Sequence, residues 1–217
     1  LKHYTYYDST EFKRLLEEQE IINQMNSALA NKEFEVYLQP QYNHVTGNLI
    51  GAEALVRWNH PLRGLVSPIK FIPIFEKNGF ITKLDEYIWE RVCQILKNWT
   101  DRGISLIPIS VNISRRDIYN PRLPDILLGL VTKYSIPPGF LKLEITESAY
   151  VENPDQLVDV VKRLRQMHFV VEMDDFGSGY SSLNSLKDVP VDLLKLDMKF
   201  LSMSKNSDRG GNILNSI

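Results

Sequence analysis

Short apolar runs that end on charged residues recur along the chain, and helix-like segments separate them. The runs LKLEITE, FVVEMDDFG and VDLLKLD place Glu144, Asp174 and Lys195 near their ends. A carboxylate within an apolar strand costs free energy unless a cation pairs with it. The recurrence therefore predicts a polar site that several strands build together, in which a shared cation or cationic ligand holds the acids.

Strand-like and helix-like segments alternate from residue 34 onward, which is typical of an α/β fold with a mostly parallel sheet. Residues 1–30 are charged and have a helical period behind the cap candidates Asp8, Ser9 and Thr10, so they predict a connecting helix. Thr82 is the candidate cap of the next helix. The expected strands are 34–42, 49–58, 104–114, 140–147, 168–176 and 193–197, and the later helices are 82–99, 121–134, 154–167 and 181–187.

Two architectures fit this order, a doubly wound open sheet and a (β/α) barrel. An open sheet concentrates its site at one switch point, whereas the loops that follow the strands of a barrel all converge on one mouth. Polar residues follow nearly every expected strand, which favours the barrel. The residues that could meet at its mouth are Glu53, Asn112, Glu144, Asp174, Lys195 and Asp197.

The spacing of two charged pairs separates strand positions from loop positions. Lys195 and Asp197 are two residues apart, so both project from one face of their strand. Glu144 and Glu147 are three residues apart and cannot both point inward from a regular strand. Glu147 is therefore expected in the loop beyond the strand, as a supporting residue.

Composition excludes several classes of protein. The 217 residues suffice for one sizeable core, and the 25 basic and 27 acidic residues nearly cancel, so neither DNA, RNA nor an anionic membrane is an expected partner. Cys93, the only cysteine, is expected in the core, and the lack of a partner thiol favours a cytoplasmic protein. No signal peptide and no apolar stretch of about 18 residues is found, although a longer parent protein could be membrane-tethered.

Six ordered blocks carry a family resemblance: GAEALVRWNHP with LQPQ upstream, SPIKFIPIFEKNGFI, SVNIS, LEITES, DDFGSGYSSL and VDLLKLDMKF. From about Phe34 to Ser202 the chain resembles the EAL domain, a bacterial phosphodiesterase module that hydrolyses cyclic di-GMP to linear pGpG. The preceding YYDSTEFKRLLEEQEIINQMNSAL resembles the end of a GGDEF domain and its linker. The resemblance implies a linker helix over residues 1–33, after a preceding GGDEF-like domain, and an EAL domain over residues 34–217.

The resemblance also implies a TIM-like (β/α) barrel whose first strand runs against the others, with divalent metal ions beside the scissile phosphodiester. Ligand sets made only of oxygen select hard cations such as Mg²⁺ or Mn²⁺, and two ions are expected. By resemblance, the metal ligands are Glu53, Asn112, Glu144, Asp174 and Asp175.

Catalytic and binding roles follow from the same resemblance. The implied catalytic residues are Lys195, Glu53, Asp174 and Glu147, and the implied substrate-binding residues are Gln39, Leu55, Arg57 and Asp197. Lys195 would position the attacking water or help to deprotonate it, while Asp197 would hold Lys195. Arg57 suits a forked contact with phosphate. Glu147 would hold the loop 176–180, which in the family couples metal binding to dimerisation.

Each assignment has a structural alternative. Glu53 could instead form a buried ion pair with Arg57. Glu144 and Glu147 could be acids at the start of the next helix, and Lys195 could be a solvated residue at a strand end.

Asn112 could be a strand-end amide, and Asp175 could merely cap its loop. The glycines of loop 176–180 form no GxxxxGK[ST] pattern, which favours a loop that moves over a phosphate cradle.

The EAL pattern normally continues with further strand-helix units that carry an acid in an AEGVE-like segment and a glutamine in a QGY-like segment. Neither segment is present before Ile217. We therefore expect a barrel that is incomplete at its C-terminus, with open edges beside VDLLKLD and beside the first strand. Such edges predict a homodimer or a strand-exchanged oligomer.

Three functions remain open at this stage. The intact motif acids favour metal-dependent hydrolysis of cyclic di-GMP, which the missing segments could impair. The alternative is a catalytically inactive cyclic di-GMP receptor that signals through the leading helix, and a third hypothesis is a structural dimerisation module. Turnover separates the first two, and metal or nucleotide binding separates both from the third.

Overall fold

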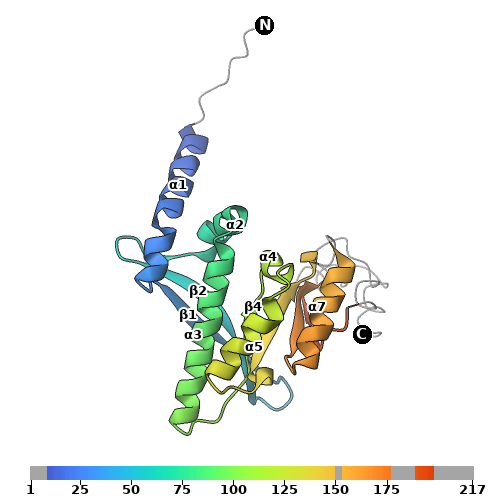
Figure 1. The fold of residues 1–217 in the computed structure, drawn as a ribbon. Coiled ribbons are helices and arrows are strands. Elements are labelled where there is room, and N and C mark those ends of the chain that lie inside the picture. Colours follow the sequence, from blue (N-terminus) through green and yellow to red (C-terminus); the bar gives the residue numbers. More distant parts are fainter. Residues whose placement is uncertain (1–8, 150–152, 177–188, 198–217) are drawn as a thin grey trace.

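The computed structural model describes residues 9–149, 153–176 and 189–197. Helices and strands alternate, and Figure 1 shows α1 projecting from the rest of the chain. None of the described helices is both long and apolar enough to cross a lipid bilayer. The elements in chain order are α1 (Ser9–Ala30), β1 (Phe34–Tyr42), β2 (Leu49–His60), β3 (Gly64–Val66), α2 (Pro68–Asn78), α3 (Ile81–Asp101), β4 (Ile109–Asn112), α4 (Arg115–Ile118), α5 (Leu123–Lys133), the 3₁₀ turn η1 (Pro138–Phe140), β5 (Leu141–Thr146), α7 (Pro154–Gln166), β6 (Val171–Phe176) and β7 (Leu193–Leu196).

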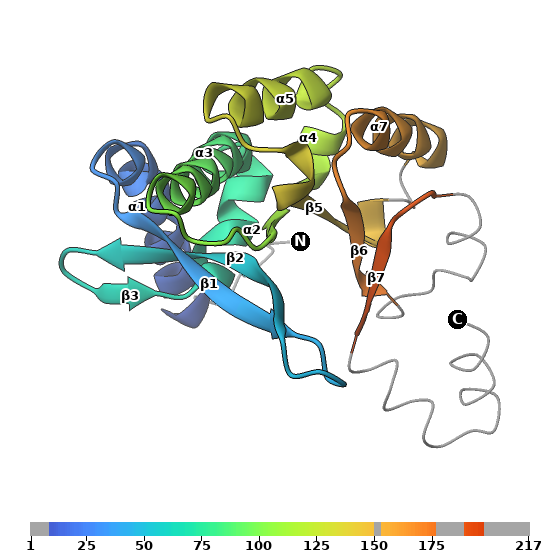
Figure 2. The same ribbon diagram turned by 90° about the horizontal axis from the view of Figure 1, so that it is seen from below.

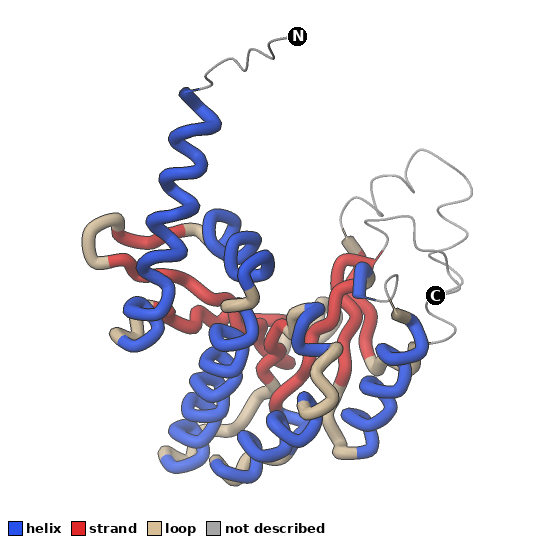
Figure 3. The backbone as a smooth tube through the Cα atoms, turned by 45° about the horizontal axis from the view of Figure 1, so that its top comes forward, coloured by secondary structure: helices blue, strands red, loops and turns tan. Residues whose placement is uncertain are grey.

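One sheet holds all the described strands, in the order β1-β2-β4-β5-β6-β7, with β3 paired to β2 outside this path. β1 runs antiparallel to β2, and every later neighbouring pair along the path is parallel, so the predicted antiparallel first strand is confirmed. No backbone pairing joins β7 to β1 among the described strands, and hydrogen bonds therefore do not close the sheet. Helices α3, α5 and α7 lie along one side of the sheet, as Figures 2 and 3 show.

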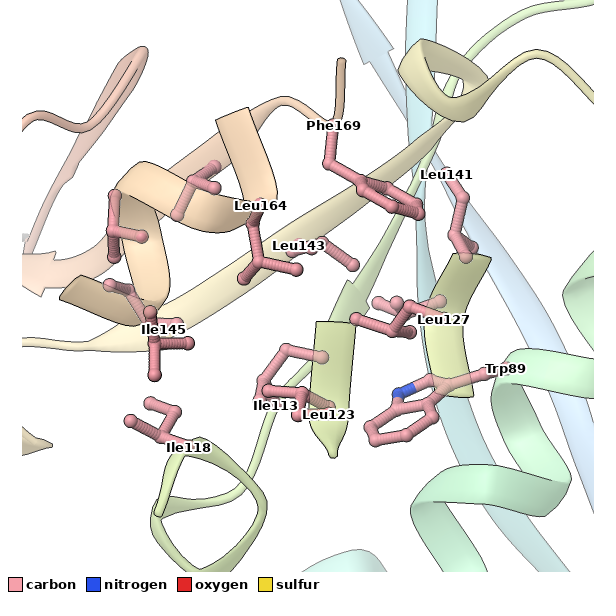
Figure 4. Close-up of a cluster of buried hydrophobic side chains, with 14 of the residues drawn as sticks. Trp89, Ile113, Ile118, Leu123, Leu127, Leu141, Leu143, Ile145, Leu164 and Phe169 are labelled. Atoms are coloured by element: carbon pink, nitrogen blue, oxygen red, sulfur yellow. The ribbon is translucent and has the colours of Figure 1, made fainter. Parts of the chain in front are cut away.

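The larger hydrophobic core lies between the sheet and helices α3, α5 and α7 (Figure 4). Alternate strand residues face this core, as Ile109 and Val111 of β4 and Leu143 of β5 do. Cys93 of α3 is fully buried in the same cluster, as predicted. The residues between these apolar positions consequently face the opposite side of the sheet, which is where the polar residues of the sequence pattern fall.

A second core joins α1 to the first strands. Its centre is a group of aromatic side chains from β1, β2 and α2, namely Phe34, Trp58, Phe71 and Phe75. Ile21 and Ala28 of α1 are buried in this cluster, and Gln24 of α1 hydrogen-bonds the ring of His60 at 2.8 Å. The C-terminal half of α1 therefore belongs to the folded body, whereas Leu15 in its N-terminal half is 50% exposed.

The predicted cap of α3 is wrong. The helix begins at Ile81, so Thr82 lies inside its first turn, and the cap residue Phe80 makes no side-chain cap bond. Gly79, with a φ of 84°, ends α2 and turns the chain directly into α3. Phe80 packs its ring against Phe75 at 4.8 Å between centroids, so burial of an aromatic residue fixes this helix start.

Two predicted strands begin three or more residues later in the structure. β4 covers Ile109–Asn112 rather than 104–114, because Pro108 has no N–H to donate to a neighbouring strand. β6 begins at Val171 rather than at residue 168, because His168 has a φ of 66° and cannot continue an extended strand. β3, α2 and α4 were not predicted, and the expected helix at 181–187 lies outside the described residues.

Candidate active site

Four side chains with carboxylate or amide oxygens, each from a different strand, lie on the side of the sheet that faces away from the larger core. Glu53 comes from β2, Asn112 from β4, Glu144 from β5 and Asp174 from β6. In the parallel pairing, Asn112 is the direct partner of Glu144. Since the carboxyl ends of parallel strands share one edge of a sheet, side chains far apart in the sequence meet there.

The ammonium group of Lys195, from β7, lies at the centre of these carboxylates. Its Nζ donates to Glu53 Oε2 at 2.9 Å and to Glu144 Oε1 at 2.8 Å, and it lies 3.7 Å from Asp174 Oδ1. Glu53 is therefore paired with Lys195 rather than with Arg57, whose guanidinium donates to the carbonyl of Val56. Lys195 is held by acids, so its alternative as a solvated strand-end residue is wrong.

Burial and charge shift two pKa values in this cluster. Burial raises the pKa of Glu144 to about 7, and the nearby Glu53 and Asp174 add to the shift while Lys195 opposes it. Burial alone would lower the pKa of Lys195, but its hydrogen bonds with Glu144 and Glu53 outweigh that effect and raise it. In this arrangement Lys195 is a cation and holds its proton near neutral pH.

The sequence matches the EAL domain family over residues 22–217. The chain belongs to the EAL domain family. It is 32% identical over 206 residues to the bifunctional diguanylate cyclase/cyclic di-GMP phosphodiesterase MucR of Pseudomonas aeruginosa, which covers 94% of this chain and 30% of that protein. It is 33% identical over 204 residues to the cyclic di-GMP phosphodiesterase NbdA of the same species, over 94% of this chain and 26% of NbdA. The chain thus spans about a quarter to a third of the length of these relatives.

Solved EAL structures share the fold. The phosphodiesterase MucR in complex with cyclic di-GMP superposes with a TM-score of 0.82 at 32% identity, over 91% of this chain and 80% of that one. The FimX EAL domain of Pseudomonas aeruginosa, bound to cyclic di-GMP, superposes with a TM-score of 0.78 at 22% identity, over 90% and 78% of the two chains, which supports the fold alone. The predicted TIM-like α/β architecture is thereby confirmed.

EAL phosphodiesterases generally depend on divalent metal ions, and the oxygen cluster of this EAL domain fits such an ion. Glu144 is 1% exposed, and its Oε2 has no hydrogen-bond partner among the described residues. A buried carboxylate oxygen without a partner costs free energy that a cation would offset. Three carboxylates and one amide supply the hard oxygen ligands that Mg²⁺ and Mn²⁺ prefer. Among the described residues, no three His, Cys, Asp or Glu side chains are arranged to hold a metal ion, and the Lys195 ammonium is paired with Glu53 and Glu144.

Two further acids of the EAL domain lie next to this cluster. Asp175 follows Asp174 with a φ of 56°, at a bulge where the pairing of β6 with β7 shifts register. Regular alternation along β6 would turn the Asp175 side chain toward the larger core. The bulge prevents this, and Asp175 is exposed. Glu147 lies just beyond β5, as predicted, is 3% exposed, and donates its backbone N–H to the carbonyl of Asp174 at 3.2 Å. Glu147 thus ties the end of β5 to β6.

Three of the four residues expected to bind substrate lie on β1 and β2, and the fourth, Asp197, follows β7. Leu55 and Arg57 follow Glu53 at intervals of two in β2, so all three share a strand face, and Gln39 of β1 is the pairing partner of Glu53. Leu55, Arg57 and Asn112 line a cavity of about 380 Å³, whose apolar wall comes from α2 and α3. Asp197 follows β7 and donates its backbone N–H to the carbonyl of Phe176.

Two polar clusters of the EAL domain were missed by sequence reasoning. In α3, Asp85 lines the cavity, accepts a hydrogen bond from the Ser114 N–H at 3.3 Å, and bonds Asp117. The SRRD spacing from Ser114 to Asp117 is a capping pattern that could have shown the start of α4. The second cluster consists of Ser110, Lys142 and Glu172. Each of these residues lies two positions before Asn112, Glu144 or Asp174 in the same strand.

Proposed function

We propose that the protein hydrolyses cyclic di-GMP to linear pGpG with divalent metal ions, in bacterial second-messenger signalling. The observation that carries this proposal is the convergence of Glu53, Glu144 and Asp174 on one cation, Lys195. Carboxylates that share one ammonium and leave a buried oxygen without a partner among the described residues form a site suited to cations. The names of MucR and NbdA, both cyclic di-GMP phosphodiesterases, support the choice of substrate.

The metal ligands we propose are Glu53, Asn112, Glu144, Asp174 and Asp175, for two Mg²⁺ or Mn²⁺ ions. Bound ions of this kind polarise phosphoryl oxygens and lower the pKa of a bound water toward neutrality. The chain itself supplies the orientation: β2, β5 and β6 fix three of the carboxylates, and Glu147 fixes the end of β5 against β6.

The substrate would lie across Gln39, Leu55 and Arg57, beside the acids. The guanidinium of Arg57 suits a phosphate oxygen pair, and the apolar wall of the 380 Å³ cavity suits a purine ring. Lys195 would orient the attacking water as a hydrogen-bond donor, and Asp197 would hold it through their common strand face.

We also propose that residues 1–33 link this domain to a preceding GGDEF-like domain and that the protein forms a homodimer. The bifunctional name of MucR supports the first part. Exposed apolar side chains on α1, among them Phe12 at 47% and Leu16 at 50%, support a contact with another folded surface. Sedimentation velocity at increasing concentration tests the dimer.

The deciding experiment measures cyclic di-GMP binding and cleavage with Mg²⁺ or Mn²⁺ and with EDTA. Glu53→Ala removes one carboxylate from the cation site, and we expect it to reduce pGpG release at least 100-fold, about 2.7 kcal/mol or more in the barrier. Glu11→Ala, which removes an exposed carboxylate of α1, is the matched control and should leave turnover unchanged. Binding without metal-dependent turnover would support a receptor or a phosphodiesterase impaired by the missing segments, and a longer chain that carries the AEGVE-like and QGY-like segments would separate the two.

A further inference from the structure

Lys195 occupies the position that a metal ion would need. Its ammonium donates to one oxygen of Glu53 at 2.9 Å and to one oxygen of Glu144 at 2.8 Å, and it lies 3.7 Å from Asp174 Oδ1. A divalent ion such as Mg²⁺ binds its oxygens at about 2.0–2.1 Å. A metal ion and an ammonium group cannot use the same two oxygens at once, because both their sizes and their positive charges exclude each other.

The Lys195 ion pair leaves its acid incompletely satisfied. Glu144 Oε1 accepts from Lys195, but Oε2 is buried and has no partner among the described residues. A metal ion binds carboxylates at shorter distances and with twice the charge, so it can satisfy this group better than the ammonium does.

A second ion pair, between Lys142 of β5 and Glu172 of β6, has a hydrogen-bond partner for both carboxylate oxygens. Glu172 accepts from Lys142 through Oε1 at 2.9 Å and from Ser110 through Oε2 at 2.8 Å. Both of its oxygens are bonded, and its side chain is 1% exposed. Both oxygens of Glu172 therefore have a partner, whereas one oxygen of Glu144 has none among the described residues.

Lys195 is more exposed than Lys142. Its side chain is 23% exposed, against 15% for Lys142, and its stem has four methylene groups. Rotation of this stem would carry the ammonium off the acids while β7 keeps its backbone pairing with β6.

We propose that Lys195 is an internal counter-cation that occupies the acid cluster in the metal-free protein and competes with the divalent ion for Glu53 and Glu144. Metal binding then requires Lys195 to move off these acids, which releases its ammonium for the attacking water. This competition lowers the affinity of the site for the divalent ion. The proposal rests on the proposed metal-dependent function.

The experiment measures the dissociation constant of Mn²⁺ by calorimetry for the wild-type chain and for variants, without substrate. Lys195→Met removes the competing charge at similar volume, and we expect Mn²⁺ to bind at least tenfold more tightly while phosphodiesterase turnover falls. Lys195→Arg retains the charge and should keep the wild-type affinity within about threefold. Lys142→Gln is the matched control, because it removes a nearby charge but keeps a donor for Glu172. It should also change the affinity less than threefold.

Melting in EDTA adds a second measurement. Lys195→Met should melt at a lower temperature than the wild type in EDTA, because three carboxylates lose their cation, and Mn²⁺ should raise its melting temperature by more. If Lys195→Met is unfolded in EDTA, Lys195→Gln keeps a donor for Glu144 and carries the same expectation. Equal or weaker Mn²⁺ binding by folded Lys195 variants would overturn the competition but leave the phosphodiesterase standing. Absence of Mn²⁺ binding in every chain would overturn the metal site itself.

Discussion

Asp85 is a half-buried acid with the buried acid Asp117 beside it. It hydrogen-bonds Asp117, and its Oδ2 accepts from the Ser114 N–H at 3.3 Å. Burial, with the neighbouring Asp117 as the next cause, raises the pKa of Asp85 well above its ordinary value. The folded protein therefore keeps a proton on Asp85 at pH values where the unfolded chain has lost it.

This raised pKa predicts a pH dependence that one substitution removes. Because the folded state binds the extra proton, the free energy of unfolding falls as pH rises above about 3.9, the unfolded value. Asp85→Asn stays neutral, can accept from the Ser114 N–H and can donate to Asp117. We expect the free energy of unfolding of the wild type to fall from pH 4 to 7 relative to that of the variant, which lacks this dependence. Urea unfolding across that range measures it, with exposed Asp101→Asn in the same helix as the control, and parallel profiles for all three proteins would contradict it.

The sequence predicts which single residues are polar at strand ends but not which of them pair. Glu53, Glu144 and Lys195 stand out because each interrupts an apolar period of two. The partner of Glu53 is 142 residues away, and the nearer Arg57 was an equally reasonable choice on spacing alone. Asp85 was missed because an acid at a helical position is normally expected to face solvent. Only the packing of α4 against α3 shows that it contacts Ser114 and Asp117.

Among the secondary-structure elements, α2 links the second core to the cavity. Phe75 is fully buried and packs its ring against Phe34 and Phe80, with centroids at 6.0 and 4.8 Å. Ile72 and Glu76 of the same helix line the cavity. Packing of one face of α2 therefore sets the position of the cavity wall.

Removal of the Phe75 ring tests this link. Phe75→Ala should lower the free energy of unfolding by about 3–5 kcal/mol, because it removes a large buried side chain and leaves a cavity. Ile69→Ala in the same helix is the control, since Ile69 is 84% exposed, and it should change stability by less than about 0.5 kcal/mol. Urea unfolding followed by circular dichroism measures both. A Phe75→Ala loss no larger than that of Ile69→Ala would show that α2 is not anchored by this cluster.

Long periodic elements were predicted well and short ones were not. The predicted helix over 154–167 is α7, and the predicted first two strands are β1 and β2, because each repeats its apolar period several times. α4 has four residues and β3 has three, which is too short for any period to show. α2 contains Pro73, which suggests a helix break in sequence terms, yet tertiary packing of its aromatic residues retains the helix.

Across the whole molecule, side chains connect parts of the sheet that its backbone does not. β2 lies next to the edge strand β1, and β7 lies at the other end of the described strand order. The Lys195–Glu53 pair spans from β7 to β2, although no backbone pairing joins β7 to β1 among the described strands. In the metal-free protein, the Lys195 ammonium therefore cross-links β7 to β2 across the interior of the curved sheet.

The acid cluster predicts that a bound metal ion stabilises the strands that carry the acids. At 100 times its dissociation constant, a ligand that binds only the folded state adds about 2.7 kcal/mol, so Mg²⁺ should raise the melting temperature of the wild type. Hydrogen exchange should slow in β2 together with β5 and β6, because Glu53, Glu144 and Asp174 would hold the same ion. Glu53→Ala should lose both effects, whereas Glu11→Ala on the exposed part of α1 should keep them. Slower exchange in β5 and β6 alone would mean that the ion holds these neighbouring strands without joining β2 to them, since β5 and β6 are already paired through their backbones.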